Sequence, residues 1–147
     1  MRSISLINVN LFLLLSLTMT HSSLAFVIDR NTYHVHIVNN LSRDLLTLSC
    51  KSKDDNLGLH ELGIGQSFSF KFHVNLFKTT LFWCNFDWGE KDHWNSIKVF
   101  YYDELFLQYC DYQNCNWSAR DDGIYLQNLR EEHQPFELMY SWKWDRR

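Results

Sequence analysis

The residues best suited to chemistry lie in one short stretch, FWCNFDWGEKDHWNS, at positions 82–96. It contains one cysteine, three acidic residues, one histidine and three tryptophans. Two carboxylates held across a cleft could hydrolyse a glycoside, and indole rings could stack on a sugar or fill a pocket in a protein partner. Carboxylates that share one short polar loop are more often hydrated than catalytic. The stretch therefore favours a binding loop over a catalytic centre.

The histidines offer a second possible chemistry, because His34 and His36 lie two residues apart in an alternating segment. Such a pair shares one face of a strand and can ligate zinc. The alternation places both side chains opposite Val35 and Ile37, on the solvent face, and no nearby residue supplies a further ligand. The sequence also lacks a G-x-S-x-G nucleophile motif, a P-loop and a dinucleotide-binding glycine motif. We expect no catalytic residue, no bound metal and no cofactor.

The N-terminus has the features of a secretory signal peptide. Arg2 supplies the positive start, Leu11 to Leu17 form a short apolar run, and Ser23-Leu24-Ala25 provides small residues for cleavage after Ala25. The run is shorter than the ~20 apolar residues that a spanning helix needs, so no membrane insertion is expected. We expect residues 1–25 to be removed and residues 26–147 to form a single secreted, extracellular domain.

The surface of residues 26–147 is expected to be mildly acidic and glycosylated. This segment holds 13 basic and 17 acidic side chains, a net charge of −4, because Arg2 alone of the 14 basic residues precedes it. Nucleic-acid binding needs clustered Lys and Arg, so nucleic acid is not an expected partner. Asn40 and Asn116 each begin a glycosylation sequon. Asn40, in an expected turn, is the favoured acceptor.

Apolar residues alternate with polar ones along most of the mature chain, which indicates half-buried strands. The expected strands are residues 33–38, 45–50, 66–72, 79–86, 96–102 and 136–143. The Asp121-Asp122-Gly123 step predicts a hairpin, and Lys53 to Gly65 reads as a long polar loop. No segment shows a helical period with caps. The pattern predicts an all-β antiparallel sandwich of about seven or eight strands, with a closed barrel as the main alternative.

The four cysteines, Cys50, Cys84, Cys110 and Cys115, indicate two disulfides in a small secreted domain. Their spacing contains no C-x-x-C pair, which disfavours zinc. Cys50 and Cys84 each lie on the apolar face of their expected strand, so a bridge between them could tie two core strands. Cys110 and Cys115 would then close a short loop. Four cysteines allow three pairings, and the crossed pairings stay open.

The tryptophans divide by their context. Trp83, Trp117 and Trp142 lie in strand-like segments and are expected to pack in the core. Trp88 and Trp94 flank the acidic loop. We expect these two rings to fold the loop back onto the domain, and the alternative is that they are exposed contact residues.

Taken together, these motifs resemble the plant self-incompatibility S1 family, the S-protein homologues. The resemblance runs from about Tyr33 to Trp142 and rests on LSCKSKDDNLG, on FWC, and on C-x4-C-x-W followed by DDGIYL. It implies a small secreted plant β-sandwich in which all four cysteines form disulfides, without a catalytic centre. The founding members look like stigma-secreted ligands that a pollen membrane protein recognises, and recognition in the family is attributed to variable hydrophilic loops.

We therefore expect a non-enzymatic ligand, monomeric, that binds a cell-surface or membrane protein receptor through its loops. The candidate loops are Lys53 to Asn56, Asp87 to Trp94 and Asp111 to Asn114. The candidate partner-binding residues are Asp87, Trp88, Glu90, Lys91, Asp92, His93 and Trp94. One alternative is a carbohydrate-binding module that uses Trp88 and Trp94 as stacking platforms. Another is a cell-wall hydrolase in which Glu90 or Asp92 is the acid.

Overall fold

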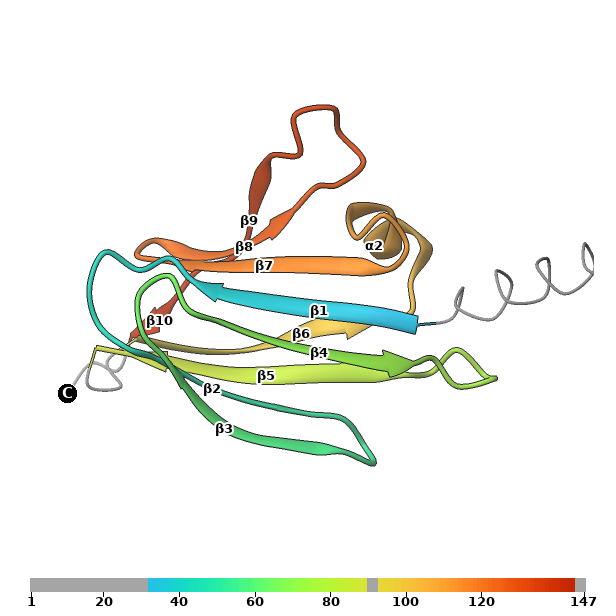
Figure 1. The fold of residues 1–147 in the computed structure, drawn as a ribbon, viewed down its shortest axis with the longest axis horizontal. Coiled ribbons are helices and arrows are strands. Elements are labelled where there is room, and N and C mark those ends of the chain that lie inside the picture. The colour runs from blue at the N-terminus through green and yellow to red at the C-terminus, as the bar shows by residue number, and fades with distance from the viewer. Residues whose placement is uncertain (1–31, 90–92, 145–147) are drawn as a thin grey trace, which may run out of the picture. The chain divides into compact units, whose positions relative to one another are not determined.

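The computed structural model describes residues 32–89 and 93–144. The expected signal peptide and its cleavage site lie outside the described residues, as do Glu90, Lys91 and Asp92. The described residues form two five-stranded sheets that pack as a sandwich (Figure 1). The predicted all-β sandwich is thus confirmed.

Each sheet mixes strands from early and late parts of the chain. Sheet A has the order β4 (Ser67–His73), β1 (Thr32–Asn39), β7 (Asn114–Arg120), β8 (Gly123–Gln127) and β9 (Phe136–Tyr140). Sheet B has the order β10 (Lys143–Trp144), β6 (His93–Tyr101), β5 (Leu81–Trp88), β2 (Leu46–Lys51) and β3 (Asn56–Leu62). Helix α2 (Glu104–Tyr109) connects β6 to β7. Of the eight strand pairs formed within these sheets, β1–β7 is parallel and seven are antiparallel.

The core lies between the sheets and follows the predicted alternation. Val35 and Ile37 of β1 are fully buried, as is Leu48 of β2. Trp117 of β7 is 1% exposed, and its Nε1 donates a hydrogen bond of 3.0 Å to the carbonyl oxygen of Val99 in β6. This bond joins sheet A to sheet B across the core.

The phenylalanines of β4 extend the core toward one edge of the sandwich. Phe70 and Phe72 are partly buried and contact Phe82 of β5, with ring centroids 5.1 Å and 4.5 Å apart. Phe72 also meets Phe100 of β6 edge-on, at 4.6 Å. Because β4 belongs to sheet A and both partners belong to sheet B, these rings close the sandwich along its β4 side.

Three parts of the chain differ from the sequence-based expectation. The single strand expected at residues 136–143 is divided between β9 in sheet A and β10 in sheet B. Strand β3 lies inside the expected loop Lys53 to Gly65, where it forms an edge strand beside β2. Its alternation was hidden because most of its side chains are exposed and Gly58 adopts φ +82°. Helix α2 was also missed, because six residues are too few to show a helical period. Asp103 caps it by accepting a hydrogen bond of 3.0 Å from the Phe106 backbone N–H.

Candidate recognition site

The two disulfides hold the elements from which the expected recognition loops leave. Cys50 and Cys84 lie directly opposite each other in β2 and β5, with Cα atoms 4.0 Å apart. Cys110 and Cys115 join the end of α2 to the start of β7. All four cysteines are buried. The sequence left three pairings open, and the structure has Cys50–Cys84 and Cys110–Cys115.

The β5–β6 hairpin is tighter than the sequence predicted. Asp87 and Trp88 end β5, and His93 and Trp94 begin β6, so the expected loop from Asp87 to Trp94 was too long. Gly89 begins the connection with φ +64°, a conformation that side chains disfavour. A Cβ at this position would lie 3.1 Å from His93 Nδ1. Glycine is needed here for both reasons.

Trp88 anchors this hairpin in the core. Its side chain is 6% exposed and stacks on His93, with ring centroids 4.0 Å apart. Trp142 meets Trp88 edge-on at 6.0 Å, and the ring of Trp144 contacts His93 with centroids 4.0 Å apart. Packing was the expected role of Trp88 and Trp142, and it is confirmed. Trp144 was not predicted as a site residue, although it continues the alternation of Tyr140 and Trp142.

Ring stacking, rather than hydrogen bonding, holds this anchor. The Nε1 of Trp88 and the Nδ1 of His93 are both buried, and within residues 32–89 and 93–144 neither has a hydrogen-bond partner. Buried polar atoms usually find a partner, because leaving one unpaired costs free energy. The burial of the Trp88 ring must offset that cost.

Trp88 and Trp94 lie on opposite faces of sheet B. In the antiparallel pairing of β5 with β6, Asp87 lies opposite Trp94 and Trp88 lies opposite His93. Directly opposed residues share a face, so Trp94 points outward, where the Lys143 Nζ lies 4.7 Å from its ring centroid. Trp88 and Trp94 therefore do not form the pair of stacking platforms that the carbohydrate-binding alternative requires. Trp94 is partly exposed and remains available for contact.

The three candidate loops lie at two different ends of the sandwich. Strand β5 spans eight residues from Leu81 to Trp88, roughly 25 Å at the usual strand rise. The hairpin lies at its C-terminal end. The loop after β2 and the start of β7 lie near its N-terminal end (Figure 1).

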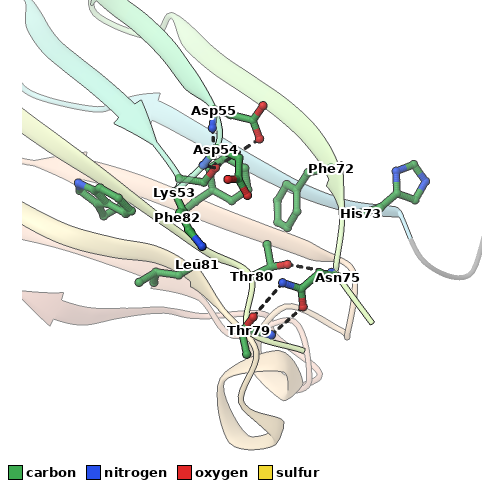
Figure 2. Close-up of a pocket in the computed structure, with 12 residues that line it drawn as sticks. Lys53, Asp54, Asp55, Phe72, His73, Asn75, Thr79, Thr80, Leu81 and Phe82 are labelled. Carbon is green, nitrogen blue, oxygen red and sulfur yellow. Dashed lines mark hydrogen bonds between the residues drawn. The ribbon is translucent and has the colours of Figure 1, made fainter. Parts of the chain in front are cut away.

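The loop after β2 borders a cavity of about 430 Å³ (Figure 2). Lys53, Asp54 and Asp55 line one side of it, and Asn75 and Thr79, from the segment between β4 and β5, line the other. The walls carry both charged and aromatic side chains. The cavity is thus a polar hollow between two loops, close to the Cys50–Cys84 bridge.

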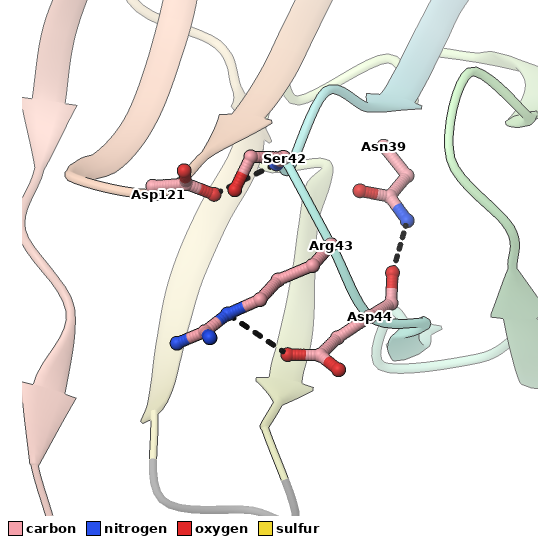
Figure 3. A network of polar contacts seen from close by, with 5 residues as sticks. All are labelled: Asn39, Ser42, Arg43, Asp44 and Asp121. Carbon is pink, nitrogen blue, oxygen red and sulfur yellow. Dashed lines mark hydrogen bonds and ion pairs between the residues drawn. The ribbon is translucent and has the colours of Figure 1, made fainter.

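A polar network lies at the hairpin end of the sandwich. It connects residues at and after the end of β1 with Asp121, between β7 and β8 (Figure 3). The backbone N–H of Ser42 donates to Asp121 Oδ1 at 2.9 Å, and hydrogen bonds from the Ser42 side chain and backbone lower the pKa of the Asp121 carboxyl. Asn39 is fully buried, and its Nδ2 donates to the Asp44 carbonyl at 3.2 Å. The sequence had suggested only a turn at Asn39. Arg43 pairs with Asp44 at 3.8 Å, on the surface.

The two sequons occupy different surroundings. Asn40 is exposed beyond the end of β1, and its Nδ2 donates to Ser118 Oγ at 2.8 Å. Asn116 lies within β7, between β1 and β8. Its Nδ2 donates a hydrogen bond of 2.9 Å to Gln127 Oε1. Glycosylation of either asparagine stays a prediction, and the exposed loop position favours Asn40.

The histidines of β1 face outward, as the alternation predicted. His34 is exposed, and His36 Nδ1 is hydrogen-bonded to Ser69 Oγ of β4. Within residues 32–89 and 93–144, no three His, Cys, Asp or Glu side chains are grouped to hold a metal ion. In the same part of the chain, no helix is long and apolar enough to cross a membrane.

Fold and site together define a small β-sandwich with two internal disulfides that presents loops at both ends. Residues 34–142 match the family model of plant self-incompatibility protein S1. The chain therefore belongs to this family, the S-protein homologues, and the resemblance found in its sequence is confirmed.

Individual relatives agree with this assignment. S-protein homolog 1 of Arabidopsis thaliana is 37% identical over 114 residues, which cover 77% of this chain and 72% of that protein. S-protein homolog 29 of the same plant is 38% identical over 111 residues, or 74% of this chain and 76% of that protein. The match to S-protein homolog 74 is 37% identical and covers 65% of this chain, but only 63% of that protein's length.

A solved structure shows the same fold. It matches with a TM-score of 0.58 and 24% sequence identity, and the match covers 77% of this chain and 96% of that chain. That structure represents the SPH (self-incompatibility protein homologue) proteins, described as a widespread family of small, highly stable, secreted proteins from plants.

Proposed function

We propose that this chain is a secreted, non-enzymatic plant ligand that binds a protein on the cell surface through its loops. The observation that carries the proposal is family membership, since the S1 family model covers residues 34–142. The description of the structurally similar SPH proteins as secreted supports the extracellular location. S-protein homologues are not a known enzyme family, which supports the absence of catalysis.

The construction of the β5–β6 hairpin supports a role in recognition. Its first strand is tied to β2 by the Cys50–Cys84 bridge, and its base is held by the buried ring of Trp88. A rigid base lowers the entropy lost when a loop binds a partner. The outward side chains of Asp87 and Trp94, together with the polar residues between the strands, form the proposed contact surface.

Proximity labelling on intact plant cells tests this proposal directly. The purified protein, fused to a labelling enzyme, should mark a cell-surface protein. The variant Asp87→Asn/Glu90→Gln/Asp92→Asn should mark it at least about tenfold less efficiently, as loss of a central contact would cause. The control Glu61→Gln/Glu131→Gln/Glu132→Gln removes as many charges elsewhere and should label normally. Equal labelling by both variants would exclude the hairpin charges, and labelling of no surface protein would refute the proposal.

A further inference from the structure

Two large apolar side chains project into solvent at the end of the sandwich opposite the hairpin. Leu76 is 96% exposed and Phe77 is 85% exposed, and they are adjacent in the segment between β4 and β5. Single exposed apolar residues are ordinary, but large side chains that project together often mark an interaction site. The sequence analysis did not single out this pair. We call residues 75–78 the Leu-Phe turn.

The Leu-Phe turn is held in one conformation by Asn75. The backbone N–H of Lys78 donates to the Asn75 carbonyl at 3.0 Å, which closes the turn. The Asn75 side chain accepts from the Thr79 N–H at 2.9 Å and donates to Thr79 Oγ1 at 2.8 Å (Figure 2). The Asn75 N–H donates to Thr80 Oγ1 at 2.9 Å. The turn is therefore organised before any partner arrives, which reduces the entropic cost of binding.

The fold does not explain why these two residues are apolar. Leu76 and Phe77 occupy the central positions of the turn, where Pro, Gly, Asn, Asp and Ser are the usual residues. At 96% and 85% exposure they contribute almost nothing to the core. Asn75 and the threonines after it already supply the turn-forming contacts. An apolar pair held rigidly in water is suited to filling a pocket on another molecule.

The surroundings of the turn are acidic. Asp54, Asp55 and Lys53 lie across the 430 Å³ cavity from the turn, and the Lys51 Nζ lies 5.7 Å from the ring centroid of Trp83, which also lines the cavity. On the other side, the Lys78 ammonium lies 4.8 Å from the Tyr102 ring centroid and interacts with Glu104 at the start of α2. Asp103 precedes Glu104 as the helix cap, and His73 also lines the cavity. The four carboxylates outnumber the three lysines in this set, so the end of the domain favours a basic partner surface.

We propose that the Leu-Phe turn, with the loop of residues 52–55 and the start of α2, docks a protein partner. The partner offers an apolar pocket for Leu76 and Phe77, rimmed by basic side chains. This inference rests on the proposed function, because it names a second contact surface of the same ligand. A lipid bilayer fits less well, since the carboxylates repel anionic headgroups. The two side chains also carry less hydrocarbon than a myristoyl chain, which by itself anchors a protein only marginally.

Competition on intact plant cells tests the inference. Labelled wild-type protein is bound to cells and displaced with unlabelled variants. Leu76→Ser/Phe77→Ser should compete at least about tenfold more weakly than wild type. The matched control is Leu59→Ser, which changes a 69% exposed residue in the middle of β3, away from both proposed contact surfaces. It should compete as wild type does. Both variants should unfold at the wild-type temperature, because the substituted side chains are exposed.

The outcomes separate this inference from the function on which it rests. If wild-type protein shows no saturable binding, the proposed function fails, and the docking surface fails with it. If wild type binds and Leu76→Ser/Phe77→Ser competes equally well, only the docking surface is overturned. Binding to phosphatidylcholine vesicles, with or without phosphatidylserine, that the same substitution abolishes would assign the turn to a membrane instead. A wild-type dimer in sedimentation that the substitution dissociates would assign it to a second copy.

Discussion

Trp117 joins the two sheets both by packing and by a hydrogen bond. Its ring is 1% exposed, and its indole N–H reaches the Val99 carbonyl in the opposite sheet. Trp117→Phe leaves that carbonyl unpaired and opens a cavity, so the free energy of unfolding should fall by about 2–4 kcal/mol. Urea unfolding measures it. Trp83→Phe changes a partly exposed ring and should cost clearly less, whereas equal costs would contradict the inter-sheet role of Trp117.

Asp121 gives the molecule a residue-level response to pH. Its carboxyl pKa is lowered by hydrogen bonds from the Ser42 side chain and backbone. A carboxyl whose folded pKa is depressed stabilises the fold above its unfolded pKa, and this contribution is lost as pH falls through the folded value. An NMR titration should therefore place the Asp121 midpoint below that of an unstructured aspartate. Ser42→Ala should raise the midpoint. A wild-type midpoint at or above the ordinary value would contradict the network.

Two residues, Trp88 and Asn39, show what the sequence could and could not predict. The packing of Trp88 was predicted but its place in a strand was not, although Trp88 continues the inward alternation of Phe82, Cys84 and Phe86. Asn39 offered no such signal. It resembles a turn residue in sequence, yet it is fully buried, and its Nδ2 donates to the Leu62 carbonyl at 2.8 Å. That contact joins positions 23 residues apart and depends on tertiary structure alone.

The two disulfides close loops of very different length. Cys50 and Cys84 are 34 positions apart, whereas Cys110 and Cys115 are 5 apart. The chain-entropy model gives about 4 kcal/mol of stabilisation for the longer loop and about 2 kcal/mol for the shorter one. Cys50→Ala/Cys84→Ala should therefore destabilise more than Cys110→Ala/Cys115→Ala in urea unfolding. All four cysteines are buried, so both pairs incur a similar cavity cost. The reverse order would contradict this account.

Strands with strict alternation could be predicted from the sequence, and elements defined by distant contacts could not. β1, β2 and β4 appeared where the pattern placed them, and the parity of Cys50 and Cys84 indicated their bridge. β3 was not predicted, because it is a largely exposed edge strand with little apolar alternation. The parallel pairing of β1 with β7 brings together segments about 80 residues apart, which local patterns do not encode. The parallel pairing places the start of β7 at the same end of the sandwich as the start of β1, and so decides which loops lie together.

At the scale of the whole molecule, the sandwich separates two proposed contact surfaces. The hairpin and the Leu-Phe turn lie at opposite ends of β5, roughly 25 Å apart. Substitutions that far apart usually act independently. If both surfaces contact the partner, the binding free energies lost in the hairpin charge variant and in Leu76→Ser/Phe77→Ser should add in the combined variant. Cell-binding isotherms of the three variants measure this. A combined loss well below the sum would show that the ends are coupled.

The central claim is that this domain is a secreted ligand for a protein on the cell surface. Its most direct test is a saturation isotherm of the labelled, disulfide-bonded wild-type protein on intact plant cells, measured before and after mild protease treatment of the cells. The account predicts saturable binding that protease treatment removes and that cell-wall polysaccharides do not compete. Binding that fails to saturate, survives protease or is displaced by a polysaccharide would contradict it.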